Sequence, residues 1–516
     1  MRNSFTTLSS WLIHACAYCA VCLVTLLLVL LCLAVVTCRR RVTNRLRATQ
    51  QQRQGRGKIV AFFHPHCSGG GGGERVLWKA LQVLGDMAEQ QQSSSSSSSD
   101  KQQQQQPPLI QRVMVYTIDP PTPHYARTVL QHAQTRFAIA ISDKLKIQFV
   151  HLDAYKHLLD PAPRFSLIVE SLGAMRLAWH GLQQSAKDNG LPHVFCDTTG
   201  CAFTFFPASL YFGCTVMAYV HYPTISTDML QLVWERRRAA YNHDTQIASS
   251  RVQTAVKFVY YTAFAILYGA VGSCATVVLV NSTWTFRHIQ FLWKGPAWRK
   301  AIRIVYPPCA VQDLQSLATC NHNKQRLPCI VSIGQFRPEK DHVLQLQAMA
   351  RLLHQHATEL KSTKLILMGS CRNSDDEVRL ADLRQLAHEL DIADHVEFCV
   401  NEPYATIKHW LGQASVGLHT MWNEHFGIGI VEMMAAGLLV VAHNSGGPRT
   451  DIITPKRTGF LASTVDEYAT AMYQALTLPA AEATIMRTAA VASSQRFSDE
   501  VFSQSFRDAI VEAKIL

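Results

Sequence analysis

The stretch KIVAFFHPHCSGGGGGERVLWKALQVL, residues 58–84, joins an apolar run to a helical pattern through five consecutive glycines. Residues 58–64 have the composition of a buried strand, and the apolar residues of 74–84 recur at the spacing of one helix face. The glycines between them allow another group to approach the backbone closely, next to the start of the helix. The stretch therefore predicts a βα unit with a ligand-binding loop at the carboxyl end of its strand.

The same alternation of apolar runs and helical patterns continues along the chain and begins again after VYPPC, residues 305–309. Such runs, each followed by a helix, are typical of parallel, doubly wound sheets. We therefore expect an α/β fold with two Rossmann-like domains that face a cleft. The further strand-like runs are RVMVYTID (112–119), KIQFVHL (146–152), HVFCDTTG (193–200), TVMAYVHYP (215–223), CATVVLVNS (274–282), PCIVSIGQF (328–336), KLILMGS (364–370), HVEFCV (395–400), SVGLHT (415–420) and LLVVAHN (438–444).

The composition changes along the chain mark the expected domain boundaries. A Ser/Gln-rich segment, residues 90–106, is expected to be a disordered surface loop because it has too few apolar side chains to bury. Residues 258–280 carry no charge and are expected to form a helix and then a strand; a helix that contacts the membrane and a second membrane span are the alternatives. The expected parts are a membrane anchor (1–38), a basic stem (39–57), a first domain (58–308), a linker (309–326), a second domain (327–492) and a C-terminal helical segment that can pack back on the first domain (493–516).

The formal net charge of +12 is concentrated beside an uncharged apolar segment. Residues 11–38 contain no Asp, Glu, Lys or Arg and are long enough to span a bilayer, while 39–58 contain eight basic residues and no acidic ones. The positive-inside rule then predicts a lumenal N-terminus and a cytosolic body. Because the charge is not spread over a folded domain, nucleic-acid binding is not expected. Five of the fifteen cysteines lie in the anchor and the other ten are scattered singly through apolar sequence, which favours buried thiols in a reducing compartment.

Three polar or glycine-rich loops follow strands of the second domain. HTMWNEHFGIGIVEMMAAG (419–437) places Glu424 at the entrance of a helix and Glu432 about two turns further on. SIGQFRPEKDH (332–342) supplies Arg337 and Lys340, which could neutralise a diphosphate, and SGGPRTD (445–451) adds a glycine turn. Each motif alone also fits an ordinary solvated loop or helix, but together they predict one site at the same edge of one sheet.

These motifs resemble the donor site of retaining glycosyltransferases of the GT-B fold, glycosyltransferase family 4. The resemblance covers nearly the whole chain from Lys58, except for the low-complexity segment. Four stretches closely resemble the GDP-mannose-dependent α-1,2-mannosyltransferases that extend dolichol-linked oligosaccharides. These stretches are FFHPHCSGGGGGERVLW (62–78), YVHYPTISTDML (219–230), VNSTWT (280–285) and HTMWNEHFGIGIVEMMAAG.

The resemblance implies roles for particular residues. Arg337 and Lys340 would hold the diphosphate of GDP-mannose, Glu432 would accept hydrogen bonds from the ribose, and Glu424 would contact the transferring mannose. The catalytic set would be Glu424, His221, Arg337 and Lys340. The donor-binding set would be Arg337, Lys340, Glu424, Phe426, Gly427, Ile428, Glu432, Gly70, Gly71, Gly72 and Gly73.

The resemblance also implies the substrates and the location. The acceptor would be a dolichol-diphosphate-linked Man(3)GlcNAc(2) oligosaccharide, extended by two successive mannoses at the cytosolic face of the endoplasmic reticulum membrane, with other mannosyltransferases of the pathway as candidate partners. The sequence contains no Asp-x-Asp triplet of the kind that metal-dependent transferases use, so no metal is expected. Two alternatives stay open: another GT-B lipid glycosyltransferase with a different nucleotide sugar, and a membrane-tethered scaffold subunit without activity.

Overall fold

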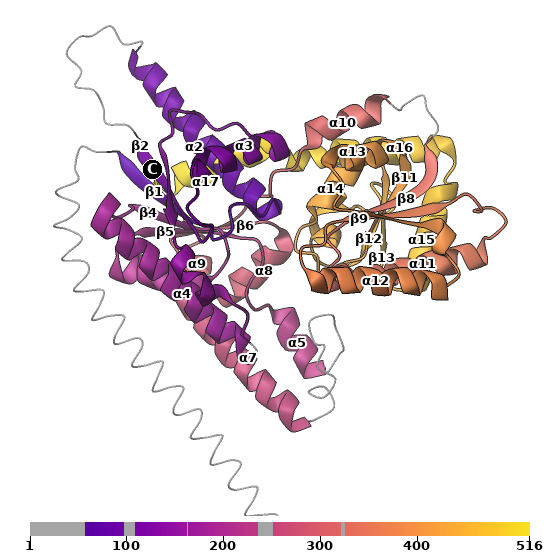
Figure 1. Ribbon diagram of the computed structural model, residues 1–516, viewed down its shortest axis with the longest axis horizontal. Helices are drawn as coiled ribbons and strands as arrows, with labels where there is room; N and C mark the ends of the chain where they lie inside the picture. The colour runs from indigo at the N-terminus through magenta and orange to yellow at the C-terminus, as the bar shows by residue number, and fades with distance from the viewer. Residues whose placement is uncertain (1–56, 97–108, 163, 236–250, 321–325) are drawn as a thin grey trace, which may run out of the picture.

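The protein consists of two α/β domains that lie side by side (Figure 1). The computed structural model describes residues 57–96, 109–162, 164–235, 251–320 and 326–516. The predicted anchor (1–38) and all but the last residue of the predicted basic stem (39–57) lie outside these ranges. Within them, the prediction of an α/β protein with two parallel sheets is confirmed.

The first domain is built on a parallel sheet of seven strands in the order β3-β2-β1-β4-β5-β6-β7. The strands are β1 (Lys58–Phe63), β2 (Ile110–Thr117), β3 (Ile147–His151), β4 (Val194–Asp197), β5 (Thr215–Val220), β6 (Val277–Val280) and β7 (Ile302–Ile304). The helices are α2 (Gly72–Ser96), α3 (Tyr125–Phe137), α4 (Ser166–Gln184), α5 (Thr227–Glu235), α7 (Arg251–Gly272), α8 (Thr283–Leu292) and α9 (Lys294–Trp298).

The strand β1 shows why this sheet is buried on both sides. Ile59, Ala61 and Phe63 point into the core on one face of the sheet, while Val60 and Phe62 point into the core on the other. Successive side chains of a strand point to opposite faces, so an unbroken apolar run requires a cover on each. The sheet therefore lies between two layers of helices, and its loops are left to meet at the edges.

The second domain repeats this architecture with six parallel strands in the order β10-β9-β8-β11-β12-β13. The strands are β8 (Leu327–Ile333), β9 (Lys364–Gly369), β10 (Val396–Val400), β11 (Ala414–His419), β12 (Leu439–His443) and β13 (Phe460–Ala462). The helices of this half are α10 (Val311–Cys320), α11 (His342–Gln355), α12 (Ser374–Glu389), α13 (Tyr404–Gln413), α14 (Ile428–Ala435), α15 (Val465–Thr477), α16 (Ala480–Ser494) and α17 (Asp499–Glu512).

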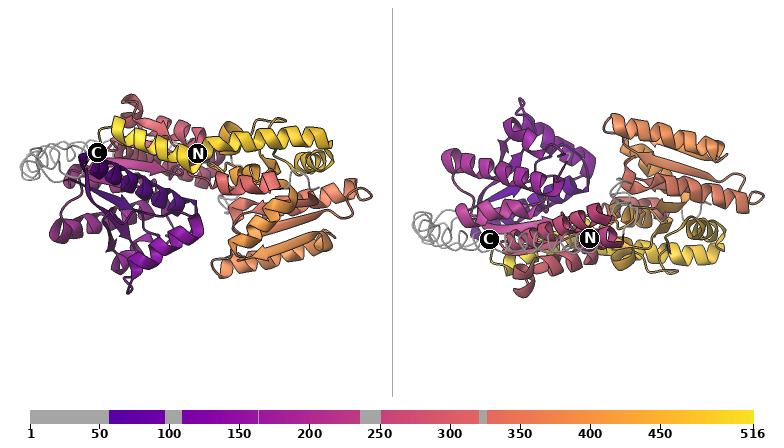
Figure 2. Two further views of the ribbon diagram at one scale, coloured as in Figure 1. Left: turned by 90° about the horizontal axis from the view of Figure 1, so that it is seen from above. Right: turned by 90° about the horizontal axis from the view of Figure 1, so that it is seen from below.

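The chain crosses between the domains twice, and the two crossings are joined. Cys309 N–H donates to the carbonyl of Phe497 at 3.0 Å, and Cys309 forms an isolated parallel bridge with Ser498. After the second crossing, α17 leaves the second domain and packs on the first (Figure 2). Phe502 and Phe506 of α17 are buried in the same core as α2. The C-terminal helix thus ties the two domains together.

The structure differs from the sequence predictions in helix α2 and in the strands β7 and β13, and agrees with them for residues 258–280. Helix α2 continues to Ser96, so the first seven residues of the predicted loop 90–106 are helical; residues 97–106 lie outside the described ranges. The strands β7 and β13 were not predicted. The uncharged stretch 258–280 does form a helix followed by a strand, and the segment Gln253–Gly272 of α7 is, among the described residues, the one helix long and apolar enough to cross a membrane.

Candidate active site

A cleft of about 670 Å³ lies where the two domains meet. It collects residues from loops that follow strands of both sheets, as the doubly wound fold predicts. The predicted site residues that line it are Gly72, Gly73, His221, Arg337, Lys340, Glu424, Phe426, Gly427 and Ile428. The remaining three, Gly70, Gly71 and Glu432, do not line it.

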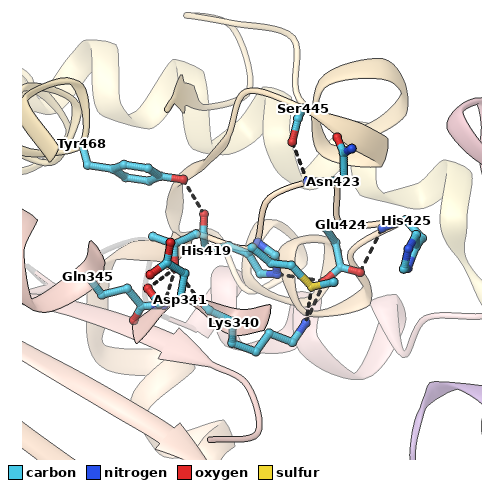
Figure 3. Close-up of polar contacts among 11 residues, drawn as sticks. Lys340, Asp341, Gln345, His419, Asn423, Glu424, His425, Ser445 and Tyr468 are labelled. Atoms are coloured by element: carbon cyan, nitrogen blue, oxygen red, sulfur yellow. Dashed lines mark hydrogen bonds and ion pairs between the residues drawn. The ribbon is translucent and has the colours of Figure 1, made fainter. Parts of the chain in front are cut away.

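The centre of the second-domain wall is the carboxylate of Glu424, shown in Figure 3. Lys340 Nζ lies 2.7 Å from Glu424 Oε2, and His419 Nε2 lies 3.1 Å from the same oxygen. Burial by itself raises the pKa of Glu424, but the charge of Lys340 and the bond from His419 outweigh it and hold that pKa well below its ordinary value. Glu424 is therefore a charged acceptor at neutral pH, with its second oxygen bonded to the N–H of His425 at 3.2 Å.

The loop that carries Glu424 is held by its own backbone and by the turn after β12. Gly427 has a φ of 113°, a conformation that side chains disfavour, and α14 begins directly after it. The N–H of Gly447 donates to the carbonyl of Glu424 at 2.8 Å, and the N–H of Asn423 donates to Ser445 Oγ at 2.7 Å. The motif 445–451 thus fixes the loop above the cleft, rather than lining it.

The wall of the second domain can receive a diphosphate. Arg337 keeps 41% of its side chain exposed and is paired with Glu339 at 2.6 Å. Lys340 reaches the same cleft, and the start of α14 at Ile428 presents backbone amides that have no partner within the helix. Two cations beside a helix N-terminus form a binding site for anions.

The wall of the first domain is formed by neutral imidazoles. Burial, followed by the influence of His425, lowers the pKa of His221 to about 4, and its Nε2 is buried without a partner among the described residues. Burial, with His221 as the next cause, lowers the pKa of His64 to about 3. Thr198 Oγ1 donates to the carbonyl of Phe63, so His64 Nδ1 must donate to Thr198 at 2.6 Å. Both rings therefore offer hydrogen bonds without charge at neutral pH.

The glycine run approaches protein groups as well as the cleft. A Cβ on Gly72 would lie 2.7 Å from Ile428 Cδ1 of the second domain, and one on Gly73 would lie 3.7 Å from His221 Nε2. Gly70 has a φ of +69°, and a Cβ there would meet the guanidinium of Arg136. The glycines therefore have structural roles beside the predicted one: at Gly72 the neighbour is the other domain, and at Gly70 the backbone conformation itself favours glycine.

Glu432 lies in the second turn of α14 and outside the cleft lining. Burial raises the pKa of its carboxyl, and the nearby Arg75 lowers it in part. Arg75 is buried and bonds to Asp499 of α17 through both carboxylate oxygens at 2.9 Å and to the carbonyl of Pro308 at 3.0 Å. Glu432 thus faces the side of the molecule where the chain crosses between domains.

No cluster that could hold a metal ion is found in the part of the chain that the structure describes: it contains no group of three or more suitably placed His, Cys, Asp or Glu side chains. His64 and His66 are close in sequence but have different surroundings: His64 is bonded to Thr198, whereas His66 is exposed.

Sequence reasoning missed several residues of the cleft. His419 and His425 stand inside the motif that was singled out for its two glutamates, and the signal for His419 was its position at the carboxyl end of a strand. Thr198 follows β4 at the corresponding edge of the first sheet. Asn423 and Asp451 do not line the cleft but contact the first domain, and short-range spacing gives no signal for those contacts.

The fold and site define a glycosyltransferase of the GT-B class. A family model described as "Glycosyl transferases group 1" matches residues 321–492. The whole two-domain arrangement is similar to that of HepE from Anabaena in complex with UDP and glucose, with a TM-score of 0.56 at 14% identity over 88% of this chain and 99% of that one. It is also similar to a sucrose-phosphate synthase from Thermosynechococcus elongatus, with a TM-score of 0.59 at 16% identity over 88% and 98%. At these identities the likeness concerns the fold.

Matches to the first domain and to the whole chain identify the family within this class. A model described as "ALG11 mannosyltransferase N-terminus" matches residues 57–293. Relatives named GDP-Man:Man(3)GlcNAc(2)-PP-Dol alpha-1,2-mannosyltransferase are 44% identical in Xenopus tropicalis, over 87% of this chain and 86% of the relative, and 42% identical in Homo sapiens, over 88% and 86%. The relative of that name in Dictyostelium discoideum is 39% identical over 87% and 83%. The chain belongs to this family of α-1,2-mannosyltransferases.

Proposed function

We propose that this chain transfers mannose in α-1,2 linkage from GDP-mannose to a dolichol-diphosphate-linked Man(3)GlcNAc(2) oligosaccharide at the cytosolic face of the endoplasmic reticulum. The observation that carries the proposal is a single cleft with two unlike walls. On the second domain, Lys340 and His419 hold a charged Glu424 beside a helix N-terminus. On the first domain, the wall is made of the glycine loop and neutral imidazoles. The names of the relatives supply the substrates.

The second-domain wall suits the nucleotide sugar. Arg337, Lys340 and the amides at the start of α14 would neutralise the diphosphate, which becomes the leaving group when the bond from C1 of mannose breaks. Positive charge fixed before the reaction stabilises the charge that develops on the leaving oxygen. Glu424 would accept hydrogen bonds from the mannose hydroxyls, and Phe426, beside it, would contact the sugar.

The first-domain wall suits the acceptor sugar. His221 Nε2 is buried and has no partner within the described ranges, so a sugar hydroxyl in the cleft would meet a polar group that needs one. The acceptor hydroxyl would attack C1, and its proton would pass to the leaving phosphate oxygen. No enzymic nucleophile is needed, so Glu424 is proposed as a binding and orienting carboxylate. The roles of Gly70, Gly71 and Glu432 in donor binding are part of the same proposal.

We further propose that the reaction needs no metal ion and that residues 1–38 anchor the chain with a cytosolic body. The two cations and the helix N-terminus supply the positive charge that a divalent metal provides in other transferases. The uncharged segment and its basic flank support the topology.

The test uses the full-length chain in detergent, with the three-mannose lipid acceptor and GDP-mannose, UDP-glucose and UDP-N-acetylglucosamine as parallel donors. We expect transfer from GDP-mannose alone, at the same rate with and without EDTA. Transfer from a UDP-sugar would assign the chain to another GT-B lipid glycosyltransferase. No transfer from any donor by a folded protein would favour the scaffold alternative.

A further inference from the structure

The two residues on either side of Glu424 both contact the first domain. Asn423 Nδ2 donates to Asp228 Oδ2 at 2.7 Å, across 195 residues of sequence. The ring of His425 stacks on Tyr222 with centroids 5.2 Å apart and lies 5.0 Å from Trp284. Glu424 itself is bonded within its own domain. Both sequence neighbours of Glu424 therefore make contacts that exist only when the two domains are together.

Asp228 is a firmly placed acceptor at the start of α5. Trp284 Nε1 donates to its Oδ2 at 3.1 Å, and His288 Nε2 lies 3.6 Å from the same oxygen. Although burial acts to raise the pKa of Asp228, the bonds from His288, Trp284 and Asn423 hold that pKa below its usual value. The carboxylate is thus charged at neutral pH and fixed by side chains of the first domain.

Asn423 connects Asp228 of the first domain to the loop that carries Glu424. Its φ of 50° is left-handed, a conformation that asparagine adopts more readily than most residues. Its N–H is bonded to Ser445 Oγ of the second domain, as Figure 3 shows, while its side chain is bonded to Asp228 of the first. Because the backbone of Asn423 is held by the second domain and its side chain by the first, the direction of the chain at the next residue, Glu424, is fixed.

A further contact joins α8 of the first domain to the motif 445–451, which holds the Glu424 loop. The N–H of Thr283, the neighbour of Trp284, donates to Asp451 at 3.1 Å, and Tyr306 OH donates to the same carboxylate at 2.9 Å. Asp451 belongs to the motif whose Gly447 holds the carbonyl of Glu424. The start of α8 therefore contacts the Glu424 loop through Trp284 and His425, and contacts the motif that holds this loop through Thr283 and Asp451.

We propose that Asp228 is a positioning residue for Glu424: acting through Asn423, it sets that carboxylate in the cleft only while the two domains are joined. The inference rests on the proposed function and deepens it, because it assigns to the acceptor domain a part in orienting the donor-site carboxylate. Neither Asp228 nor Asn423 lines the cleft, so they act without touching substrate.

The test is a charge exchange across the contact, in the full-length chain in detergent. Asn423→Asp places two carboxylates face to face and should lower kcat about 100-fold, whereas Asp228→Asn alone should lower it about 5-fold, since a neutral acceptor bonds more weakly. The double variant Asp228→Asn with Asn423→Asp restores one amide and one carboxylate at this contact, but Trp284 donates to the same oxygen of Asp228, so kcat should recover only in part, to at least about 5-fold above Asn423→Asp. Gln231→Ala, on the same helix but bonded to Glu235 on the exposed surface, is the matched control and should leave kcat unchanged.

GDP affinity, folding and kcat are measured for each variant, so that a loss of Glu424 positioning can be told apart from a loss of stability and from a failure of the proposed function. GDP affinity, measured by calorimetry, should stay within about twofold of wild type in every variant, because Arg337 and Lys340 lie in the second domain. A folded Asn423→Asp variant with wild-type kcat, or a double variant no better than Asn423→Asp, would overturn the inference. If Asn423→Asp does not fold, a wild-type kcat in Asp228→Asn overturns it as well. Failure of the wild-type chain to transfer mannose would instead refute the proposed function.

Discussion

Replacing Lys340 with methionine should separate the stability of the second domain from its activity. The side chains of Lys340 and Glu424 are 24% and 14% exposed, so the substitution leaves a nearly buried carboxylate with His419 as its remaining side-chain partner. Breaking a buried ion pair on one side costs about 3 kcal/mol at the lower end of the measured range. For a domain of this size that loss corresponds to a fall in Tm of about 6–12 °C.

The double variant Lys340→Met with Glu424→Gln distinguishes the two effects. Replacing both partners of a buried pair removes the uncompensated charge, so most of the lost Tm should return. The activity should not return, because neither the cation nor the anion of the cleft remains. We expect kcat in both variants to be about 100- to 1,000-fold below wild type, the loss typical of removing one electrostatic contact to a developing charge.

Thermal unfolding followed by fluorescence and mannose transfer under saturating donor measure the two quantities on the same preparations. The stabilising contribution of Glu424 should be present above pH 4.5 and be lost as the pH falls below it, since the folded-state pKa of this carboxyl is depressed. A Lys340→Met variant with wild-type kcat, or a double variant that regains activity together with Tm, would refute this account of the cleft.

Three further predictions concern single residues. Glu432→Ala should reduce kcat/KM for GDP-mannose by about 100-fold, or about 2.7 kcal/mol, while Glu432→Gln keeps part of the hydrogen bonding. Steady-state kinetics with varied donor measure this, and unchanged kinetics in both variants would remove Glu432 from the site. Gly447→Ala should lower kcat at least about 10-fold although Gly447 does not line the cleft, because its Cβ would lie 2.6 Å from the carbonyl of Phe426 and must displace the loop that carries Glu424. An active, stable variant would contradict the role given to this turn. The pKa of His221 is about 4 against an ordinary 6.5, so the unfolded chain binds a proton that the folded chain excludes, and stability should fall as the pH drops from 6.5 to 4. His221→Gln should reduce that slope by about 1.4 kcal/mol per pH unit in denaturant titrations, and an unchanged slope would mean that the ring is not neutral in the folded state.

The fold could be predicted because long buried strands carry their own signal. The run 59–63 is apolar throughout, and it lies inside a sheet covered on both faces. The strands β7 and β13 were missed since each has three residues and forms the edge of its sheet, too short for a pattern to emerge. Helix α2 extended into the Ser/Gln-rich segment because a helix that is already nucleated propagates into residues that would not start one.

The positions of the site residues could be predicted, but their partners could not. Arg337, Lys340 and Glu424 follow strand ends, and parallel topology brings such ends to one edge. The bonds of Glu424 to Lys340 and His419 depend on the path of a loop with a left-handed glycine, and no spacing rule gives that path. The contact of Gly72 with Ile428 depends on how two domains meet, which is a property of tertiary packing alone.

The most direct test of the central claim is the product of the reaction, compared between wild type and Glu424→Gln. The purified chains are incubated with GDP-mannose and the three-mannose lipid acceptor in EDTA, and the released oligosaccharide is analysed by mass spectrometry before and after an α-1,2-specific mannosidase. The account predicts one or two added hexoses with wild type, complete removal by the mannosidase, and about 100-fold less product with Glu424→Gln. Added hexoses that resist the mannosidase, or equal product from the variant, would contradict it.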